Sequence, residues 1–552
     1  MKKIYGDYTI DYLKTLSHSD LTKIITELQS EDNFIIMTDS YKMTHHLLTP
    51  DKLQEVYSYL ESRGGEMEYT TLCTLQYYLM KYLAGVRITK EKIEEAREFN
   101  IKHFGFDCFD DKLWNHILEK HGGKLPLEIK AVPEGTPIKV KNILMSIRNT
   151  DKNCAALTNI TETLLMKLWA PNTVATYNRH IKELIMKYCK LTSDVPLEFT
   201  KFSHHDFGYR GVSSEETGRI CSMAAMTQFE GTDTLGGIKL IRDYYNGDMS
   251  GYSVIATEHM VVCSYGSREN EMVSYRTIIN NVKEKYKDVD VPSKTIILSL
   301  VSDTYNIYNV CYNILPSLSD EFIGWKNSKG CSIKIVIRPD SGDPESTLFG
   351  YKNPNEFKEY DDIFNAVKED MFISDELTTE LLSKGVFGIL FDKFGSSFNS
   401  KGYKTLNPQI GVLQGDGISL KTIEKLLIRM YVDKIDTMSL VFGSGGKNLQ
   451  AHDRDEQKYA IKATHVIVDG NNINVQKKPA TDPMKVSKTG YLKLRKFGNT
   501  WRDYETISSV DKEKYDETDD FLELVFLNGE IMKKYTVDDI RENAKILECE
   551  LS

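Results

Sequence analysis

The sequence predicts an α/β protein of two domains, an irregular parallel (β/α) barrel packed against a mixed α/β domain. From about residue 196, short apolar or β-branched runs alternate with longer helical stretches, and each run ends abruptly in charged or glycine-containing sequence. This alternation is typical of a parallel barrel. The 552 residues, 41% of them hydrophobic, also exceed what one small domain needs.

The pattern changes place the domain boundaries. We expect residues 1–195 and 455–552 to form the mixed domain, and residues 196–454 to form the barrel. In the mixed domain, residues 89–104 and 155–169 have helical periodicity and residues 127–132 that of a strand. The predicted barrel strands are 197–202, 253–256, 295–301, 333–337, 410–413 and 438–442. Residues 345–405 interrupt this rhythm and are interpreted as an insertion on the rim, without assigned chemistry.

Composition excludes several classes of protein. The 80 acidic residues outnumber the 70 basic ones and give a net charge of -10, so neither nucleic acid nor an anionic membrane is an expected partner. No apolar run reaches the length of a signal-peptide core or a membrane span. The nine cysteines contain no Cys-x-x-Cys pair, which indicates reduced thiols and a cytoplasmic protein.

Polar segments follow the predicted strands, and in a barrel they would converge on one face. Gly443, Gly445 and Gly446 follow a strand and can turn backbone N–H groups toward a phosphate. Arg338 and Asp340 offer a forked cation and a carboxylate suited to a phosphorylated sugar. A tight turn without a ligand explains the glycine motif equally well, and a surface ion pair explains Arg338 and Asp340 equally well. Asp416 in QGDG is a weak signal by itself.

Two further segments suggest a heterocycle and a reactive histidine. Phe207 and Arg210 share a glycine-bearing loop, where a flat ring could stack beside a charged group. Glu258 precedes His259, a pair that fits an acid, a base or a phosphoryl acceptor. An ordinary core phenylalanine and a structural histidine are the alternatives.

Taken together, the motifs resemble the nicotinamide phosphoribosyltransferase family, within the type II phosphoribosyltransferases. They occur in that family's order from about residue 34 to the C-terminus, outside the 345–405 segment. The motifs are TDSYKMTHH (38–46), HDFGYRGVSS (205–214), GTDTLGG (231–237), TEH, VSDTYNIYN (301–309), IRPDSGDP, QGDG and FGSGG.

The resemblance implies an irregular type II phosphoribosyltransferase barrel beside a mixed α/β domain, in a homodimer with active sites at the subunit interface. The reaction would join nicotinamide to the phosphoribosyl group of phosphoribosyl pyrophosphate, giving nicotinamide mononucleotide for NAD biosynthesis. Phe207 and Tyr41 of the neighbouring chain would sandwich the pyridine ring, and Asp233 would accept from the carboxamide. A carboxylate at this position would repel nicotinic acid at a cost of several kcal/mol.

The resemblance also assigns the donor site. Arg338 would hold pyrophosphate or the carboxamide oxygen, Asp340 and Gly415 the ribose hydroxyls, and Gly445 and Gly446 the 5-phosphate. Asp340 and Asp416 would favour the positive charge that develops on the sugar. Further implied substrate contacts are Arg210, Ser253, Ser299 and Asp39, and further phosphate contacts are Arg63, Arg454, Lys462, Lys477 and Lys485.

Mg²⁺ would bridge the pyrophosphate, and ATP would act as a coupling co-substrate that phosphorylates His259, with Glu258 and Asp303 orienting the imidazole. The chain departs from the family at Ala460, where relatives carry a serine, and in a shorter loop after Arg63. These departures put one phosphate hydrogen bond in doubt.

Three alternative functions fit the sequence less well. A nicotinate-specific enzyme of the same fold is opposed by Asp233. A catalytically silent nucleotide-binding protein would not need His259, Asp303, Arg338, Asp340 and Asp416 together. A glycoside hydrolase would leave the glycine loop and the cations without a purpose.

Overall fold

The computed structural model describes residue 17 and residues 33–481, 486–509 and 519–551. The chain divides into two compact units. Unit 1 comprises Met1–Asn172 with Asp453–Thr536, and unit 2 comprises Thr173–His452 with Val537–Ser552. Helix α7 (Trp169–Thr192) begins in unit 1 and continues in unit 2, and the C-terminal residues belong with unit 2.

A seven-stranded antiparallel sheet organises unit 1, with the strand order β16-β15-β1-β5-β3-β19-β20. The strands are β1 (Leu53–Ser62), β3 (Leu127–Ala131), β5 (Ile143–Asn149), β15 (Tyr459–Val468), β16 (Asn471–Asn474), β19 (Glu523–Leu527) and β20 (Glu530–Ile531). β1 and β15 come from opposite ends of the sequence. The sheet therefore requires both segments of the mixed domain that the sequence predicted.

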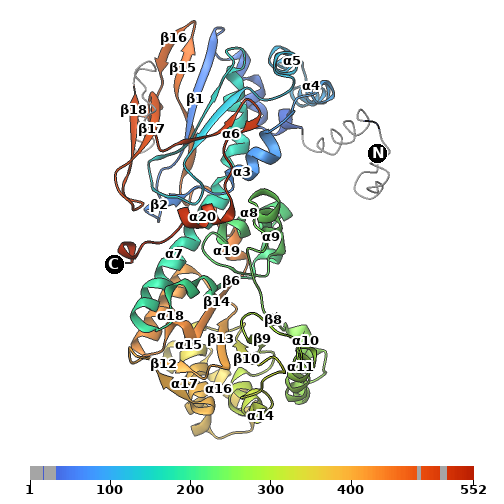
Figure 1. The fold of residues 1–552 in the computed structure, drawn as a ribbon, viewed down its shortest axis with the longest axis vertical. Coiled ribbons are helices and arrows are strands. Elements are labelled where there is room, and N and C mark those ends of the chain that lie inside the picture. Colours follow the sequence, from blue (N-terminus) through green and yellow to red (C-terminus); the bar gives the residue numbers. More distant parts are fainter. Residues whose placement is uncertain (1–16, 18–32, 482–485, 510–518, 552) are drawn as a thin grey trace. The chain divides into compact units, whose positions relative to one another are not determined.

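Helices pack beside this sheet, and two smaller sheets complete unit 1 (Figure 1). Helix α5 shows the local logic: Asp110 caps its first turn by accepting from the Leu113 N–H at 3.1 Å, and Gly122 ends it with φ 58°. The helices are α3 (Leu75–Tyr78), α4 (Lys90–Phe104), α5 (Asp111–His121) and α6 (Ala155–Met166), and the short strands are β2 (Tyr69–Thr71), β4 (Pro137–Lys139), β17 (Tyr491–Lys496) and β18 (Tyr504–Ser509).

Unit 2 contains a seven-stranded parallel sheet in the order β7-β6-β14-β13-β10-β9-β8. A parallel bridge between Gly231 in β7 and Tyr252, just before β8, connects the two edges of the curled sheet. The strands are β6 (His204–Asp206), β7 (Gly231–Thr232), β8 (Ile255–Ala256), β9 (Thr295–Val301), β10 (Ser332–Arg338), β13 (Ile410–Gln414) and β14 (Leu440–Ser444). The predicted irregular α/β barrel is confirmed.

Helices follow the strands of unit 2 and lie around them (Figure 1). They are α8 (Glu215–Ala225), α9 (Leu235–Tyr244), α10 (His259–Cys263), α11 (Glu271–Lys285), α12 (Ile307–Asn309), α13 (Leu315–Ser317), α14 (Ser319–Phe322), α15 (Pro344–Phe349), α16 (Tyr360–Met371), α17 (Asp375–Phe394), α18 (Leu420–Val432), α19 (Gly446–Gln450) and α20 (Val537–Asn543), with a hairpin of β11 (Ser396–Phe398) and β12 (Lys404–Leu406). No helix among the described residues is both long and apolar enough to span a membrane.

Two predictions need correction. Residues 197–202 form a 3-10 helix whose Phe199 and Phe202 are exposed, and the segment that pairs in the sheet is the following one, His204–Asp206. The interpretation of residues 345–405 as a rim insertion does not describe their helices. Leu382 and Phe387 are buried in the same core as Ile335 of β10, so these helices form part of the connection from β10 to β13.

Candidate active site

A cavity of about 1000 Å³ opens in unit 2, lined by residues that follow the carboxyl ends of six parallel strands. In a parallel barrel these ends share one face, so side chains distant in sequence meet there. The predicted site residues in its lining are Phe207, Arg210, Asp233, Glu258, His259, Arg338, Asp340, Gly415, Asp416, Gly445 and Gly446. The structure thus gathers most of the predicted barrel residues around one space.

Phe207 is held by the turn that follows β6. The buried Asp206 carboxylate accepts from the Gly208 N–H at 2.8 Å, and from the hydroxyls of Ser222 and Thr232 at 2.9 and 3.1 Å. The aromatic ring lies against Gly443, where an added Cβ would come within 2.3 Å of the ring's Cε2 atom. The absence of a side chain at Gly443 therefore leaves the space that the Phe207 ring occupies.

Asp233 follows β7 and is linked to Phe207 through His205. The His205 Nε2 donates to Asp233 Oδ1 at 2.9 Å, while its imidazole lies 4.7 Å from the Phe207 ring, centroid to centroid. Ser253 donates to the same carboxylate oxygen at 2.5 Å. Burial pushes the pKa of Asp233 upward, but the hydrogen bonds from His205 and Ser253 outweigh it and hold the pKa below its usual value. Asp233 is consequently an anion at neutral pH.

Arg338 stands at the end of β10. Its Nη2 donates to the Thr257 carbonyl at 2.7 Å, and its guanidinium carbon lies 5.9 Å from the centre of the Phe207 ring. The Arg338 Nε and the hydroxyl of Ser299 are buried without a hydrogen-bond partner in the described parts of the chain. Unpaired buried donors of this kind cost free energy, which a polar ligand can recover.

His259 begins α10 and faces two carboxylates. Its Nε2 lies 3.6 Å from Asp340 Oδ2 and 3.9 Å from Asp303 Oδ1, and its Nδ1 is 3.1 Å from the Thr304 hydroxyl. Asp303 is fixed through its other oxygen, which accepts from the Asp340 N–H at 3.0 Å. The imidazole is 46% exposed, so it is oriented by the protein and reachable from the cavity.

Two of the three remaining glycines lie where a neighbouring atom would clash with a side chain. An added Cβ at Gly446 would lie 2.9 Å from the Cα of Gly211, and one at Gly415 would lie 2.3 Å from Asp340 Oδ1. At Gly445, in contrast, no atom of the described part of the chain would lie within 4 Å of such a Cβ. The first two glycines therefore let loops and a carboxylate approach, while Gly445 leaves open space beside the cavity.

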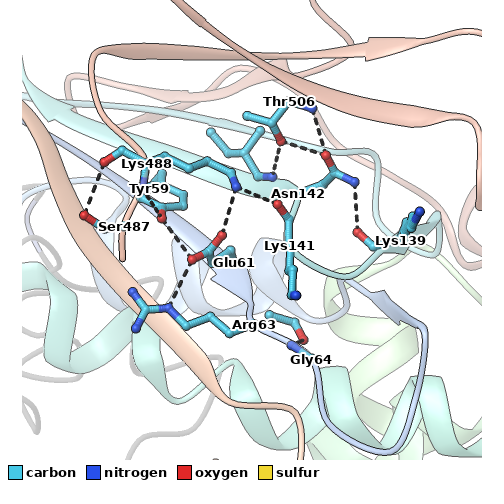
Figure 2. A network of polar contacts seen from close by, with 12 residues as sticks. Tyr59, Glu61, Arg63, Gly64, Lys139, Lys141, Asn142, Ser487, Lys488 and Thr506 are labelled. Atoms are coloured by element: carbon cyan, nitrogen blue, oxygen red, sulfur yellow. Dashed lines mark hydrogen bonds and ion pairs between the residues drawn. The ribbon is translucent and has the colours of Figure 1, made fainter. Parts of the chain in front are cut away.

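Unit 1 holds the cations predicted for phosphate. Tyr59 of β1 pairs with Lys462 of β15, and Arg63 directly follows β1. Figure 2 shows how Glu61 orients the arginine: it accepts from Arg63 Nε at 3.1 Å and from the Tyr59 hydroxyl at 2.9 Å, and Lys488 lies 3.3 Å from its second oxygen. Burial lowers the pKa of Lys462, Glu162 acts in the opposite direction, and the charges of Arg63 and Lys477 lower the pKa further. This cluster is therefore crowded with positive charge.

The other predicted residues of unit 1 are more exposed. Tyr41 is 59% exposed, and Asp39 accepts from the Thr163 hydroxyl at 2.8 Å. Arg454 pairs with the adjacent Asp455 at 3.1 Å, and Lys477 is exposed. Lys485 lies outside the described residues.

The sequence reasoning missed the residues that position the site. His205 and Asp206 lie inside the HDFGYRG motif but were not assigned a role, and Thr257 and Thr304 were also overlooked. A buried carboxylate followed two residues later by glycine was the available signal for Asp206, since such a carboxylate can cap the turn. Nothing in the sequence pattern distinguishes Thr304 from other threonines.

Comparisons with known proteins point to one family. Residues 202–514 match the nicotinate phosphoribosyltransferase (NAPRTase) family, and residues 33–129 match the N-terminal domain of nicotinamide phosphoribosyltransferase. The chain is 33% identical over 514 residues to the nicotinamide phosphoribosyltransferase of Xanthomonas campestris pv. campestris, covering 93% of this chain and 98% of that protein. It is 31% identical to that of Acinetobacter baylyi, covering 77% and 78% of the two chains.

Among solved structures, the fold is similar to the nicotinate-nucleotide pyrophosphorylase from Pyrococcus furiosus. The TM-score is 0.52 at 13% sequence identity, with 93% of this chain and 95% of that chain covered. At this identity the similarity concerns the fold alone.

Proposed function

The chain belongs to the nicotinate and nicotinamide phosphoribosyltransferase family, and from this premise we propose how its cavity works. The enzyme transfers the phosphoribosyl group of phosphoribosyl pyrophosphate to nicotinamide, giving nicotinamide mononucleotide and pyrophosphate, a step of NAD biosynthesis. The new bond joins the pyridine nitrogen to the anomeric carbon of the sugar, and the bond from that carbon to pyrophosphate breaks.

The anionic Asp233 beside Phe207 is the observation that carries the choice of substrate. One face of the Phe207 ring is available for the pyridine ring. His205 contacts both the Phe207 ring and the Asp233 carboxylate, and so fixes their relative positions. Asp233 accepts from the carboxamide N–H of nicotinamide. The carboxylate of nicotinic acid has no proton to donate there and would be repelled, which corresponds to about 100-fold discrimination or more.

The barrel face then favours a cationic transition state at the sugar. Asp340 and Asp416 bring negative charge to the cavity where the anomeric carbon becomes positive. Arg338 and Arg210 attract the departing pyrophosphate, Gly445 leaves room for the 5-phosphate, and Gly446 lets the Gly211 loop approach beside it. Positioning and electrostatics are sufficient for this reaction, so no covalent bond from the protein to the sugar is invoked.

Mg²⁺ fits this arrangement because the carboxylates of Asp340 and Asp416 are the hard oxygen donors that it prefers. When bound with pyrophosphate, it screens the charge of the leaving group.

ATP coupling through His259 belongs to the same proposal. Asp340 and Asp303 lie on the Nε2 side of the imidazole, which favours a proton on that nitrogen and leaves the lone pair on Nδ1. Nδ1 attacks the terminal phosphorus of ATP, ADP departs, and water later hydrolyses the phosphohistidine. The exposure of the ring and its place in the cavity lining support this role.

We also propose that two copies share their sites. Tyr41 of the partner subunit would cover the second face of the pyridine ring, and the cations near Arg63 would reach the phosphates from the neighbouring chain. The exposure of Tyr41 and the excess positive charge around Lys462 support this arrangement. All nine cysteines are free thiols, seven of them buried, which supports a reducing, cytoplasmic location.

Purified protein is mixed with phosphoribosyl pyrophosphate, Mg²⁺ and either nicotinamide or nicotinic acid, with and without ATP, and the products are quantified by mass spectrometry. We expect nicotinamide mononucleotide from nicotinamide, with a higher yield when ATP is present. Product from nicotinic acid alone would overturn the role of Asp233. The absence of product from both would favour a silent nucleotide-binding protein.

A further inference from the structure

Four potential metal ligands converge in unit 1, among residues to which the transferase reaction gives no role. His116 and His121 come from α5, and Asp151 and Cys154 from the segment between β5 and α6. One ligand atom from each of the four residues lies within 4.8 Å of all the others. Residues from two separate segments thus meet at a single point.

The two imidazoles share one carboxylate oxygen. His116 Nε2 lies 2.9 Å and His121 Nε2 lies 2.8 Å from Asp151 Oδ2. The other oxygen of Asp151 accepts from the N–H of Asn153 at 2.8 Å and from its side-chain amide at 3.1 Å, and that amide is 3.5 Å from His116 Nε2. Asn153 therefore holds the carboxylate with Oδ2 turned toward both histidines.

Cys154 completes the set from the buried side. Its side chain is fully buried, and its N–H donates to the Asp151 carbonyl at 2.9 Å. Among the described residues, its sulfur has no hydrogen-bond partner. The histidines and the aspartate are each between one fifth and about one quarter exposed, so an ion could enter from the solvent side.

We propose that His116, His121, Asp151 and Cys154 bind one Zn²⁺ ion. Two imidazole nitrogens, one thiolate and one carboxylate oxygen form a tetrahedral set that zinc favours. In such a site, neighbouring ligand atoms are separated by roughly 3.3 to 3.8 Å, given metal–ligand bonds of about 2.0 to 2.3 Å. The two histidine nitrogens lie 2.9 and 2.8 Å from the Asp151 oxygen, and all four ligand atoms lie within 4.8 Å of one another, so side-chain rotations would bring them to these separations. The two anionic ligands neutralise the charge of the ion.

The site would have a structural role, because it ties the C-terminal half of α5 to the segment that precedes α6. Neither segment contributes to the cavity in unit 2. The zinc site is consequently independent of the proposed reaction, and its failure would leave that proposal intact.

Zinc content of the full-length protein, purified without metal chelators, is measured by inductively coupled plasma mass spectrometry. We expect about one zinc per chain for the native protein and for a control, His103→Ala, whose histidine lies on α4 outside the cluster. His121→Ala and Cys154→Ser should each lower zinc occupancy at least tenfold. Native protein without zinc, even after incubation with Zn²⁺, would overturn the proposal, as would variants with full occupancy.

A variant that fails to fold would also lose zinc, so a second measurement identifies the ligands by the spectrum of bound Co²⁺. Native protein reconstituted with Co²⁺ should show the visible bands of a tetrahedral site together with a thiolate-to-cobalt band in the near ultraviolet. In Cys154→Ser the thiolate band should vanish. Bands typical of six oxygen ligands, or a thiolate band that persists in Cys154→Ser, would refute this ligand set.

Discussion

Replacement of Gly443 by alanine should impair nicotinamide binding by moving Phe207. The new Cβ would lie 2.3 Å from the ring's Cε2, whereas ordinary contacts begin near 3.4 Å, so the ring edge must retreat by about 1 Å. A displacement of this size at a substrate-positioning group can cost about 100-fold in rate, and such overpacking costs about 1–3 kcal/mol of stability. We expect kcat/KM for nicotinamide to fall 10- to 100-fold.

The assay follows nicotinamide mononucleotide formation while nicotinamide is varied at saturating phosphoribosyl pyrophosphate. Gly445→Ala is the matched control, because no atom of the described residues lies within 4 Å of its added Cβ. Since Gly445 borders the proposed 5-phosphate site, the comparison concerns only KM for nicotinamide at saturating donor, which should remain native. In a Phe207→Leu background, Gly443→Ala should cost much less, since the clashing ring atom is gone. Native kcat/KM in Gly443→Ala, or an equal loss in both backgrounds, would refute the steric argument.

Three further predictions concern charge. Asp233→Asn should lower the preference for nicotinamide over nicotinic acid at least tenfold, because the repelling anion is removed; an unchanged ratio in a competition assay would contradict this role. His259→Ala should abolish ATP-stimulated product formation and lower ATP hydrolysis, while isothermal titration shows native nicotinamide affinity; intact coupling would disprove the phosphohistidine. Burial raises the pKa of Glu271 to about 7, so the folded protein retains a proton that the unfolded chain releases, and stability falls as pH rises from 4.5 to 7. Glu271→Gln cannot ionise, so it should avoid about 1–3 kcal/mol of this loss of stability. Its Tm should therefore exceed that of the native protein by an amount that grows with pH. A Tm difference independent of pH would contradict the raised pKa of Glu271.

The sequence predicted the barrel well where a strand is long and buried on both faces. The run at 295–301 is β9 itself, and 333–337 lies within β10. It failed at 197–202, because the apolar run there forms a 3-10 helix, whereas the neighbouring strand, His204–Asp206, is polar and carries no apolar pattern. Residues 345–405 were interpreted only as a rim insertion, since their apolar residues are interspersed with many charges and their burial depends on tertiary packing.

The active site was predicted unevenly for a similar reason. Motif residues at strand ends, such as Phe207 and Arg338, could be assigned because the barrel topology dictates where those ends meet. Gly443 was interpreted only as part of a phosphate loop, whereas the structure shows that it makes space for the Phe207 ring. Contacts between loops depend on side-chain packing across many residues, and no local pattern in the sequence records them.

The charge distribution resolves how an acidic protein accommodates a polyanionic substrate. The net charge of -10 disfavours anions in general, yet the half-buried Lys462 lies near Arg63, Lys477 and Lys42. Burial lowers the pKa of Lys462 most, Glu162 acts in the opposite direction, and repulsion from the three cations lowers it further. This repulsion is a cost that the folded chain carries without a ligand. A polyphosphate placed among these cations would relieve it, whereas a neutral ligand would not. The same crowding therefore makes the cluster selective for highly charged anions, while the acidic remainder of the surface keeps binding of other polyanions weak.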